Sequence, residues 1–308
     1  MRTSIEYRGR NHLRRVRIKF MKEALLYEKL DGKVRCNACN HRCIIPDQKK
    51  GICGVRENQD GKLYSLVYGK IIAEHIDPIE KKPLYHFLPG TFSFSIATVG
   101  CNFKCLHCQN ADISQAPTSK SVGGKTLTPE QIVQDALKNK CPSISYTYTE
   151  PTVFMEFALD CMKLAHKKGL KNIWVSNGYM TKETLDLVSP YLDATNIDLK
   201  GFTEEFYRDI CGARLKPVLE NLVEIKKRKI HLEVTTLIIP GKNDSEKELG
   251  EIAKFIKKEL GADTPWHVSR FFPQYKMMDI PPTPVEKIHQ AVKIGKEAGL
   301  DYVYAGNI

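Results

Sequence analysis

The sequence predicts an α/β protein built as a TIM-like barrel, complete or partial, with a small cysteine-rich segment at its N-terminus. From about residue 92, short β-rich runs alternate with amphipathic helical runs, a pattern typical of a parallel sheet with crossover helices. Six or seven such units follow one another, and polar side chains collect where the expected strands end. The 308 residues, 42% of them hydrophobic and 27% charged, suit one large globular domain or two small ones.

Seven runs have the length and composition of strands. The first leads directly into a group of cysteines, and the second ends at Glu150 and is closed by Pro151. Because parallel α/β barrels place their chemistry in loops at the carboxyl ends of the strands, we expect the site there. The expected strands are 92–100, 143–150, 172–178, 194–201, 231–241, 266–272 and 301–307.

The segments between these strands have helical periodicity. The strongest start signal is at Thr128, where Thr-Pro-Glu-Gln supplies an N-cap, a proline at the first helical position and a glutamine at the third. A second helix follows Pro151 and carries apolar residues from Phe154 to Leu164. Further helices are expected near 182–188, 216–228, 246–259 and 283–298.

Polar residues mark the ends of five expected strands. Taken singly, each has an ordinary structural explanation, but agreement among five strands favours a functional site. The residues are Cys101 to Cys108 after the first strand, Glu150 after the second, Ser176 and Asn177 after the third, Asp198 and Lys200 after the fourth, and Arg270 near the end of the sixth.

The formal charge of +11 is concentrated at the start of the chain. Residues 1–20 hold seven basic side chains and one acidic one, a net of +6, which leaves +5 for the remainder. We interpret residues 1–20 as a basic, disordered leader or an upstream start, with residues 21–91 as the cysteine-rich segment and 92–308 as the barrel. A phosphate-binding arm is the alternative, but a nucleic-acid partner is disfavoured.

No membrane or secretory signal is found in the sequence. No apolar run approaches the roughly 20 residues that a bilayer-spanning helix needs. The basic start has no apolar block or small-residue cleavage site behind it, so it is a poor secretory signal. We therefore expect a cytoplasmic protein with no membrane partner.

Seven of the ten cysteines fall into two groups. In a reducing compartment such spacing indicates metal or redox chemistry rather than disulfides. The isolated Cys141, Cys161 and Cys211 are expected to be small buried hydrophobes. The groups are Cys36, Cys39, Cys43 and Cys53, spaced C-x2-C-x3-C-x9-C, and Cys101, Cys105 and Cys108, spaced C-x3-C-x2-C.

The second group is one thiolate short of a closed site. A structural zinc ion normally has four ligands, and the neighbouring His107 is placed awkwardly for ligation because it adjoins Cys108. Three thiolates can instead hold three corners of an iron–sulfur cluster, which leaves one iron open to a small molecule. We favour the cluster over zinc.

The segment GCNFKCLHCQN after the first strand resembles the signature of the radical S-adenosylmethionine (SAM) superfamily. The resemblance implies a partial (β/α)6 barrel, a [4Fe-4S] cluster on the three cysteines and SAM on the open iron. DLK at 198–200 and VSNG at 175–178 resemble the pyruvate formate-lyase, or glycyl-radical, activating enzymes. That likeness implies that Asp198 and Ser176 meet the SAM amino group and that Lys200 meets its carboxylate, and it assigns the adjacent Asn177 to cofactor binding.

A finer resemblance covers nearly the whole chain. CNACNHRC, GICGVR, DPIEKKPLYHFLPG, YTYTEPT and HVSRFFPQYKM are similar to the radical SAM proteins of the AmmeMemoRadiSam system. His107 stands where the superfamily usually has an aromatic residue near the adenine, and it can still stack there. Tyr148-Thr149-Glu150 replaces Gly-Gly-Glu, with Glu150 keeping the SAM contact. Because the family often continues with a further cysteine-bearing segment, we expect a truncation at Ile308.

The resemblance implies an activating-enzyme-like reaction. Reductive cleavage of SAM gives a 5'-deoxyadenosyl radical, which abstracts hydrogen from a protein or peptide, with a flavodoxin- or ferredoxin-type electron donor. No catalytic side chain is assigned beyond the cluster ligands. The alternative is an iron–sulfur electron carrier or a metal-stabilised RNA-binding protein, which would have no reason to place Asp198 and Lys200 beside the cluster.

The first cysteine group supports two interpretations. Cys36, Cys39, Cys43 and Cys53 can close a tetrahedral zinc site in a small knuckle. The same four thiolates can hold a second iron–sulfur cluster that relays electrons. A structural zinc site is the first interpretation and the relay cluster is the alternative. A DNA-binding zinc finger is disfavoured because no base-reading helix follows.

Overall fold

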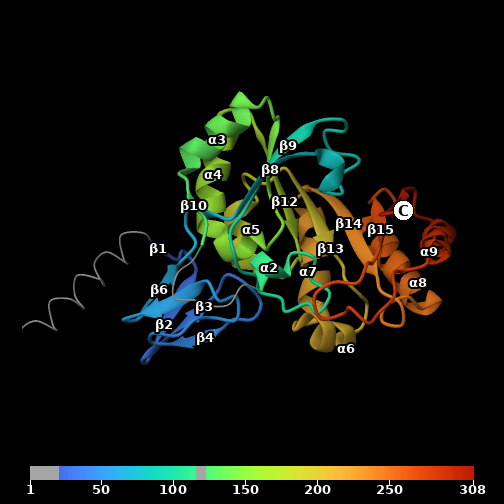
Figure 1. Ribbon diagram of the computed structural model, residues 1–308, viewed down its shortest axis with the longest axis horizontal. Helices are drawn as coiled ribbons and strands as arrows, with labels where there is room; N and C mark the ends of the chain where they lie inside the picture. The colour runs from blue at the N-terminus through green and yellow to red at the C-terminus, as the bar shows by residue number, and fades with distance from the viewer. Residues whose placement is uncertain (1–20, 116–122) are drawn as a thin grey trace, which may run out of the picture.

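The structure is a computed structural model that describes residues 21–115 and 123–308. Figure 1 shows a large sheet with helices packed against it and a smaller β-rich part beside the helices α3 (Pro129–Lys138) and α4 (Met155–Lys167). The expected leader, residues 1–20, lies outside the described residues.

The main sheet has eight strands in the order β16-β15-β14-β13-β12-β11-β9-β8. Seven are parallel, and only β8 at one edge runs antiparallel, alongside β9. In the sheet as described β8 and β16 remain separate edges, so the predicted partial barrel is confirmed. The strands are β8 (Ala73–Pro78), β9 (Phe92–Ala97), β11 (Ser143–Tyr146), β12 (Lys171–Ser176), β13 (Ala194–Asp198), β14 (His231–Ile238), β15 (Trp266–Arg270) and β16 (Val303–Gly306).

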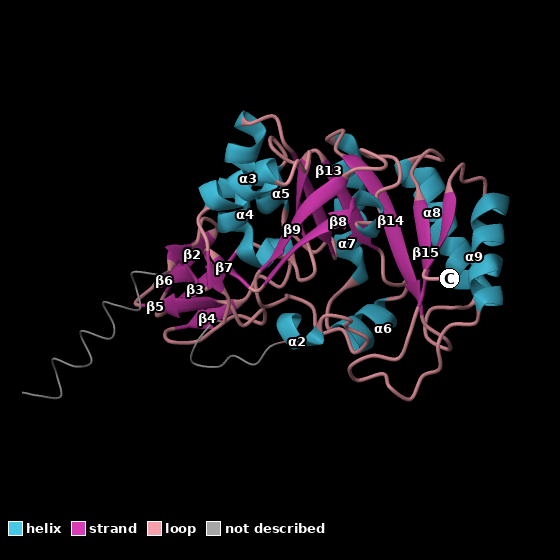
Figure 2. Ribbon diagram, turned by 45° about the horizontal axis from the view of Figure 1, so that its top comes forward, coloured by secondary structure: helices cyan, strands magenta, loops and turns pink. Residues whose placement is uncertain are grey.

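The helices between the strands follow the predicted pattern. At α3 the capping box is present, since Thr128 Oγ1 accepts from Gln131 N at 3.3 Å and Gln131 Oε1 accepts from Thr128 N at 2.8 Å. Figure 2 shows α3 and α4 at one end of the sheet and α8 and α9 at the other. The remaining helices are α2 (Ala111–Ser114), α5 (Lys182–Val188), α6 (Glu204–Phe206), α7 (Leu215–Lys227), α8 (Glu246–Phe255) and α9 (Val285–Glu297), with short turns η1 (Ile79–Lys81), η2 (Pro151–Phe154), η3 (Tyr207–Cys211) and η4 (Ile256–Leu260).

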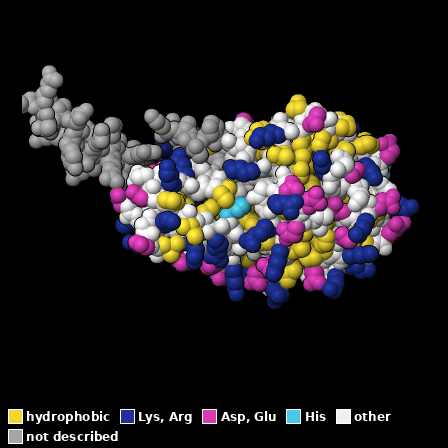
Figure 3. All heavy atoms as spheres, turned by 90° about the horizontal axis from the view of Figure 1, so that it is seen from below, with side chains coloured by type: hydrophobic (Ala, Val, Ile, Leu, Met, Phe, Trp, Pro, Cys, Tyr) yellow, Lys and Arg dark blue, Asp and Glu magenta, His cyan; other side chains and the backbone are white. Residues whose placement is uncertain are grey.

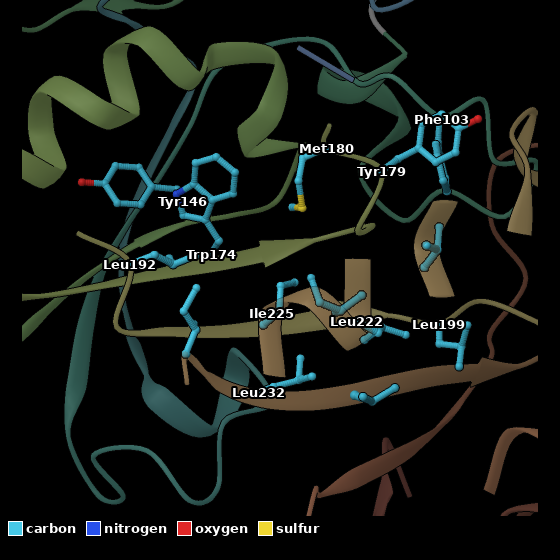
Figure 4. Close-up of a cluster of buried hydrophobic side chains, with 14 of the residues drawn as sticks. Phe103, Tyr146, Trp174, Tyr179, Met180, Leu192, Leu199, Leu222, Ile225 and Leu232 are labelled. Carbon is cyan, nitrogen blue, oxygen red and sulfur yellow. The ribbon is translucent and has the colours of Figure 1, made fainter. Parts of the chain in front are cut away.

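The largest hydrophobic core fills the space between the sheet and these helices. Trp174 and Trp266 are fully buried there, and Trp266 satisfies its indole N–H by donating to Thr236 Oγ1 at 3.0 Å. Figure 4 shows part of this cluster, with Leu222 and Ile225 of α7 near Leu232 of β14. The three isolated cysteines are buried, as expected.

The N-terminal part is built from two small antiparallel sheets. Their joint hydrophobic core is slight, six buried residues that include Cys36, so this part needs support from a bound group or from its neighbours. One sheet contains β2 (Tyr27–Leu30), β3 (Lys33–Cys36) and β4 (Ile44–Pro46); the other contains β1 (Lys22–Glu23), β6 (Lys62–Ser65) and β5 (Arg56–Gln59). A further strand pair joins β7 (Lys70–Ile71) to β10 (Lys125–Thr126).

Side-chain contacts attach the chain before residue 92 to the rest of the barrel, in addition to the pairing of β8 with β9. Arg56 of β5 forms a bidentate ion pair with Glu156 of α4, at 2.9 and 2.7 Å, and both side chains are at most 2% exposed. Further along, the segment 79–90 packs against the sheet, where Glu233 of β14 accepts from the backbone N–H groups of Tyr85 and His86. The N-terminal part therefore lies against the sheet at fixed positions.

Candidate functional site

A cavity of about 430 Å³ lies at the carboxyl edge of the parallel sheet. All nine residues that the sequence predicts for the reactive site line it, whereas Arg270 does not, because its guanidinium donates to Thr283 O at 2.6 Å and stacks over Phe272. The nine are Cys101, Cys105, His107, Cys108, Glu150, Ser176, Asn177, Asp198 and Lys200.

The three cysteines lie on the loop between β9 and α2. Phe103 anchors this loop in the core, 1% exposed and packed against Tyr179 with ring centroids 5.2 Å apart (Figure 4). The backbone N–H groups of Lys104 and Leu106 donate to carbonyls of residues 210–211 in η3. The thiols are thus fixed on an otherwise irregular loop by contacts to two other parts of the barrel.

The donor set at this loop fits an iron–sulfur cluster. Among the described residues, no three His, Cys, Asp or Glu side chains are arranged as ligands of one metal ion. The thiolates of a cubane each bind a different iron, so they need to face one cavity but not to converge on one point. Cys101, Cys105 and Cys108 face one cavity in this way.

Two of these thiols are held in their protonated form without a metal. Burial raises the pKa of Cys101 well above its usual value. A hydrogen bond with Cys211, followed by burial, does the same for the pKa of Cys105. Cluster assembly must therefore displace these protons. Cys211, which the sequence analysis gave no role, is a neighbour of the reactive loop.

Glu150, Ser176 and Asn177 form one hydrogen-bonded unit on the cavity wall. Glu150 is 1% exposed, and it accepts from Ser176 Oγ at 2.9 Å and from Asn177 N at 2.9 Å, as well as from Thr152. Burial raises the pKa of Glu150, and these hydrogen bonds partly oppose that effect. Asn177 Nδ2 in turn donates to Asn102 Oδ1 at 2.7 Å and lies 3.9 Å from Cys101 Sγ.

Asp198 and Lys200 point to the same cavity and pair with each other. The distance from Lys200 Nζ to Asp198 Oδ2 is 2.8 Å, and the side chains are 18% and 35% exposed. Burial alone would lower the pKa of Lys200, but the charge of Asp198, with the nearby thiols of Cys105 and Cys211, raises it well above its usual value. Lys200 is therefore a permanent cation on the cavity wall.

His107 is buried beside this cation. Its side chain is 4% exposed, and burial, followed by the charge of Lys200, lowers its pKa to about 3, so the ring is neutral at physiological pH. Its Nδ1 has no hydrogen-bond partner among the described residues. The ring centroid lies 6.3 Å from that of Phe206.

Sequence reasoning missed a second charged group on the cavity. Lys82 is 2% exposed, donates to Asp77 Oδ2 at 2.6 Å, and its Nζ lies 4.6 Å from the centroid of the Tyr148 ring. Tyr148 hydrogen-bonds to the same carboxylate and has a left-handed backbone, with φ of 62°. The lysine-rich segment around residue 82 carries no local signal of burial, because only the fold brings it to the strand ends.

The other four clustered cysteines come together at a second, smaller cavity. Cys36, Cys39, Cys43 and Cys53 line it together with Asn102, the residue that follows Cys101. The structure thus brings these four cysteines together, beside the reactive loop.

Within the part of the chain that the structure describes, none of the helices is long and apolar enough to cross a bilayer.

Comparison with known proteins gives the family. The chain is 50% identical over 289 residues to the uncharacterized protein MJ0808 of Methanocaldococcus jannaschii. The aligned region covers 94% of this chain and 86% of that protein. It is 20% identical over 166 residues to the pyruvate formate-lyase 1-activating enzyme of Escherichia coli K12, covering 51% and 65% of the two chains. The fold is similar to that of Streptococcus suis SuiB bound to its precursor peptide SuiA, with a TM-score of 0.54, 12% identity, and 68% and 46% coverage.

The superfamily match extends over the reactive loop and most of the sheet. Residues 95–256 match the radical SAM superfamily, and this range is more than half of the chain. It begins within β9 and includes the three-cysteine loop, β11 to β14 and the polar residues that follow them. The chain therefore belongs to the radical SAM superfamily and is a radical SAM enzyme.

Proposed function

We propose that this enzyme holds a [4Fe-4S] cluster on Cys101, Cys105 and Cys108, cleaves SAM reductively, and abstracts hydrogen from a protein or peptide in the cytoplasm. The observation that carries the proposal is that three thiols and the ion pair Asp198–Lys200 line one cavity. When bound, the cluster supplies one electron to the SAM sulfonium, which yields methionine and a 5'-deoxyadenosyl radical.

Asp198 and Lys200 are suited to hold the amino acid end of SAM. SAM presents an ammonium and a carboxylate, and the pair offers one charge of each sign at the strand ends. Each charge-assisted hydrogen bond contributes about 1.5 to 3 kcal/mol. Because the two side chains already pair at 2.8 Å, SAM exchanges one ion pair for two new ones without bringing an unpaired charge into the cavity.

Glu150, Ser176 and Asn177 form a neighbouring part of the cavity wall, since β12 pairs with β13. Glu150 fixes both Ser176 and the Asn177 backbone, and Asn177 reaches Asn102 and the Cys101 sulfur. Glu150 Oε1 already accepts three hydrogen bonds, whereas Oε2 accepts one, from Asn177 N. Oε2 therefore retains a lone pair and can still accept from the SAM ammonium. The neutral ring of His107 offers an apolar face on which the adenine can stack.

A protein or peptide substrate is supported by what the relatives act on. One similar enzyme activates pyruvate formate-lyase, a protein, and a protein with a similar fold has a precursor peptide bound. The reaction needs one electron per SAM, which a flavodoxin- or ferredoxin-type protein can supply. On the face shown in Figure 3, acidic and basic side chains of the described residues are interspersed, unlike the basic patch that nucleic-acid binding needs.

The proposal is tested by anaerobic reconstitution of the full chain with iron and sulfide, followed by dithionite and SAM. We expect 5'-deoxyadenosine from the native chain and none from Cys105→Ala, because the variant loses one of three protein ligands. Cys141→Ala is the matched control, since Cys141 is also buried but lies outside the cavity. A cluster that assembles without cleaving SAM, or a Cys105→Ala variant with native activity, contradicts the proposal.

A further inference from the structure

The four N-terminal thiols are arranged as a thiolate site. They come from separate turns of the β-rich part but line one cavity. Cys36 is buried and the other three are partly buried. Four thiolates in one protected cavity are the donor set of a tetrahedral zinc site or of an iron–sulfur cluster.

A buried positive charge lies beside these sulfurs. Arg56 lines the same cavity with a 2% exposed side chain, and its Nε has no hydrogen-bond partner among the described residues. The charge of Arg56 is already paired with Glu156, so the feature of this site that points to a bound group is the buried Nε–H without a partner.

The second site shares a wall with the reactive loop. His41 Nε2 lies 2.9 Å from the carbonyl oxygen of Asn102, which lines the N-terminal cavity. The side chain of Asn102 accepts from Asn177, whose amide also lies 3.9 Å from Cys101 Sγ. The chain at Gly100 passes so close to Cys53 that a Cβ there would stand 3.0 Å from the Cys53 carbonyl oxygen.

Solvent-exposed residues adjoin the site. Ile44 and Ile52, which are next to Cys43 and Cys53 in sequence, are 54% and 46% exposed, and Ile52 also lines the cavity. The N-terminal thiols therefore have both a solvent-exposed surface and the loop that carries Cys101 as neighbours.

We propose that Cys36, Cys39, Cys43 and Cys53 hold a second iron–sulfur cluster, which passes one electron from a flavodoxin- or ferredoxin-type donor to the cluster at Cys101, Cys105 and Cys108. The donor is oxidised by one electron, the second cluster is reduced and then reoxidised, and the reactive cluster is reduced; no bond forms or breaks. The inference rests on the proposed function, because only SAM cleavage requires this electron.

Zinc is the interpretation that the experiment must exclude. The enclosed space between the thiols is about 10 Å³, which suits a single ion, so a cluster requires the thiols to move apart. No three of these side chains are arranged as ligands of one ion, however, and the reactive loop shares this property. Four thiolates that face one cavity without converging, next to a site that consumes electrons, favour the cluster.

The metal is identified independently of SAM cleavage. In the full chain with Cys101, Cys105 and Cys108 replaced by alanine, we expect anaerobic reconstitution to leave iron and sulfide in equal amounts on the four remaining clustered thiols. Dithionite should then produce an electron paramagnetic resonance signal. One zinc per chain with neither iron nor sulfide overturns the inference, whatever the outcome for the proposed function.

The relay is tested with Cys53→Ala in the otherwise native chain. We expect SAM cleavage to be lost when reduced flavodoxin supplies the electron and to persist with dithionite, which is small enough to reach the open cavity of the reactive site. Cys141→Ala should keep both activities. Native cleavage with flavodoxin overturns the relay, and so does an equal loss with both reductants, since that result reports a structural role.

Discussion

At the residue scale, a substitution of Asp198 distinguishes a contact to SAM from a purely structural salt bridge. It pairs with Lys200 at 2.8 Å on the cavity wall. We expect Asp198→Asn to weaken SAM binding by about one to two orders of magnitude, because one charge-assisted hydrogen bond is worth about 1.5 to 3 kcal/mol. The cluster absorption spectrum should not change. Titration of SAM into the reconstituted variant measures the effect.

An exposed ion pair provides the control for this variant. Asp263 lies 3.4 Å from Lys226 and its side chain is 71% exposed, so Asp263→Asn should leave both SAM affinity and the melting temperature nearly unchanged. If Asp198→Asn keeps its SAM affinity but melts at a lower temperature, the pair is a structural salt bridge and the assigned contact to SAM is wrong.

Gly100 is a position where any side chain is strained. Its φ is +99°, and an added Cβ would lie 2.6 Å from Val55 Cγ1 and 3.0 Å from the Cys53 carbonyl oxygen. We expect Gly100→Ala to cost about 1 to 3 kcal/mol of unfolding free energy and to lower the iron content, because the loop to Cys101 must shift.

Gly90 is the matched control for the backbone strain that a side chain causes at a positive φ. It also has a positive φ, +74°, but nothing lies within 4 Å of its added Cβ. Gly90→Ala should therefore cost only the backbone strain and keep native iron content. Urea unfolding and iron analysis of both variants compare them; equal effects would mean that the close approach at Gly100 is unimportant.

At the scale of elements, the attachment of segment 79–90 to β14 depends on Glu233. The Glu233 side chain is fully buried. Burial alone would raise its pKa, but hydrogen bonds from His231, His267 and the N–H groups of Tyr85 and His86 lower it to about 2. Because this value is below the ordinary 4.5, Glu233 contributes stability above pH 4.5 that is lost as the pH falls towards 2.

We therefore expect Glu233→Gln to lower the free energy of unfolding at pH 7 by about 3 kcal/mol, the equivalent of that pKa difference. The deficit should shrink as the pH falls below 4.5. Urea unfolding from pH 7 to pH 3 measures it, with Glu286→Gln, an exposed substitution, as the control. A deficit that does not change with pH contradicts the assignment.

At the scale of the whole molecule, one buried ion pair joins the N-terminal part to the barrel. Glu156 of α4 neutralises Arg56 of β5, and neither side chain is more than 2% exposed. Glu156→Ala leaves a buried guanidinium without its partner, and we expect a loss of about 3 to 5 kcal/mol in urea unfolding.

The exposed pair Arg42–Glu183 spans the same two parts of the molecule. Its distance is also 2.8 Å, but the side chains are 37% and 45% exposed, so Glu183→Ala should cost at most about 1 kcal/mol. Similar costs for the two variants would show that burial of the Arg56 pair does not govern how the parts are held together.

The sequence by itself determined the order of elements and nine of the residues that line the cavity at the strand ends. The N-cap of α3 at Thr128, the range of α5 and all seven parallel strands follow from periodicity and capping, which are local properties. The nine cavity residues could be predicted because the carboxyl ends of parallel strands lie at one edge of the sheet. Residues that follow different strands are therefore close together in space.

Tertiary structure decided which groups became partners. The edge strand β8, the buried Lys82 and the contact between Cys105 and Cys211 had no local signal, because each depends on a segment distant in the chain. The same is true of Asn102, which lies between the two cysteine sites. Hydrophobic periodicity predicts which face of an element is buried. The residues that this face contacts depend on how the whole chain packs.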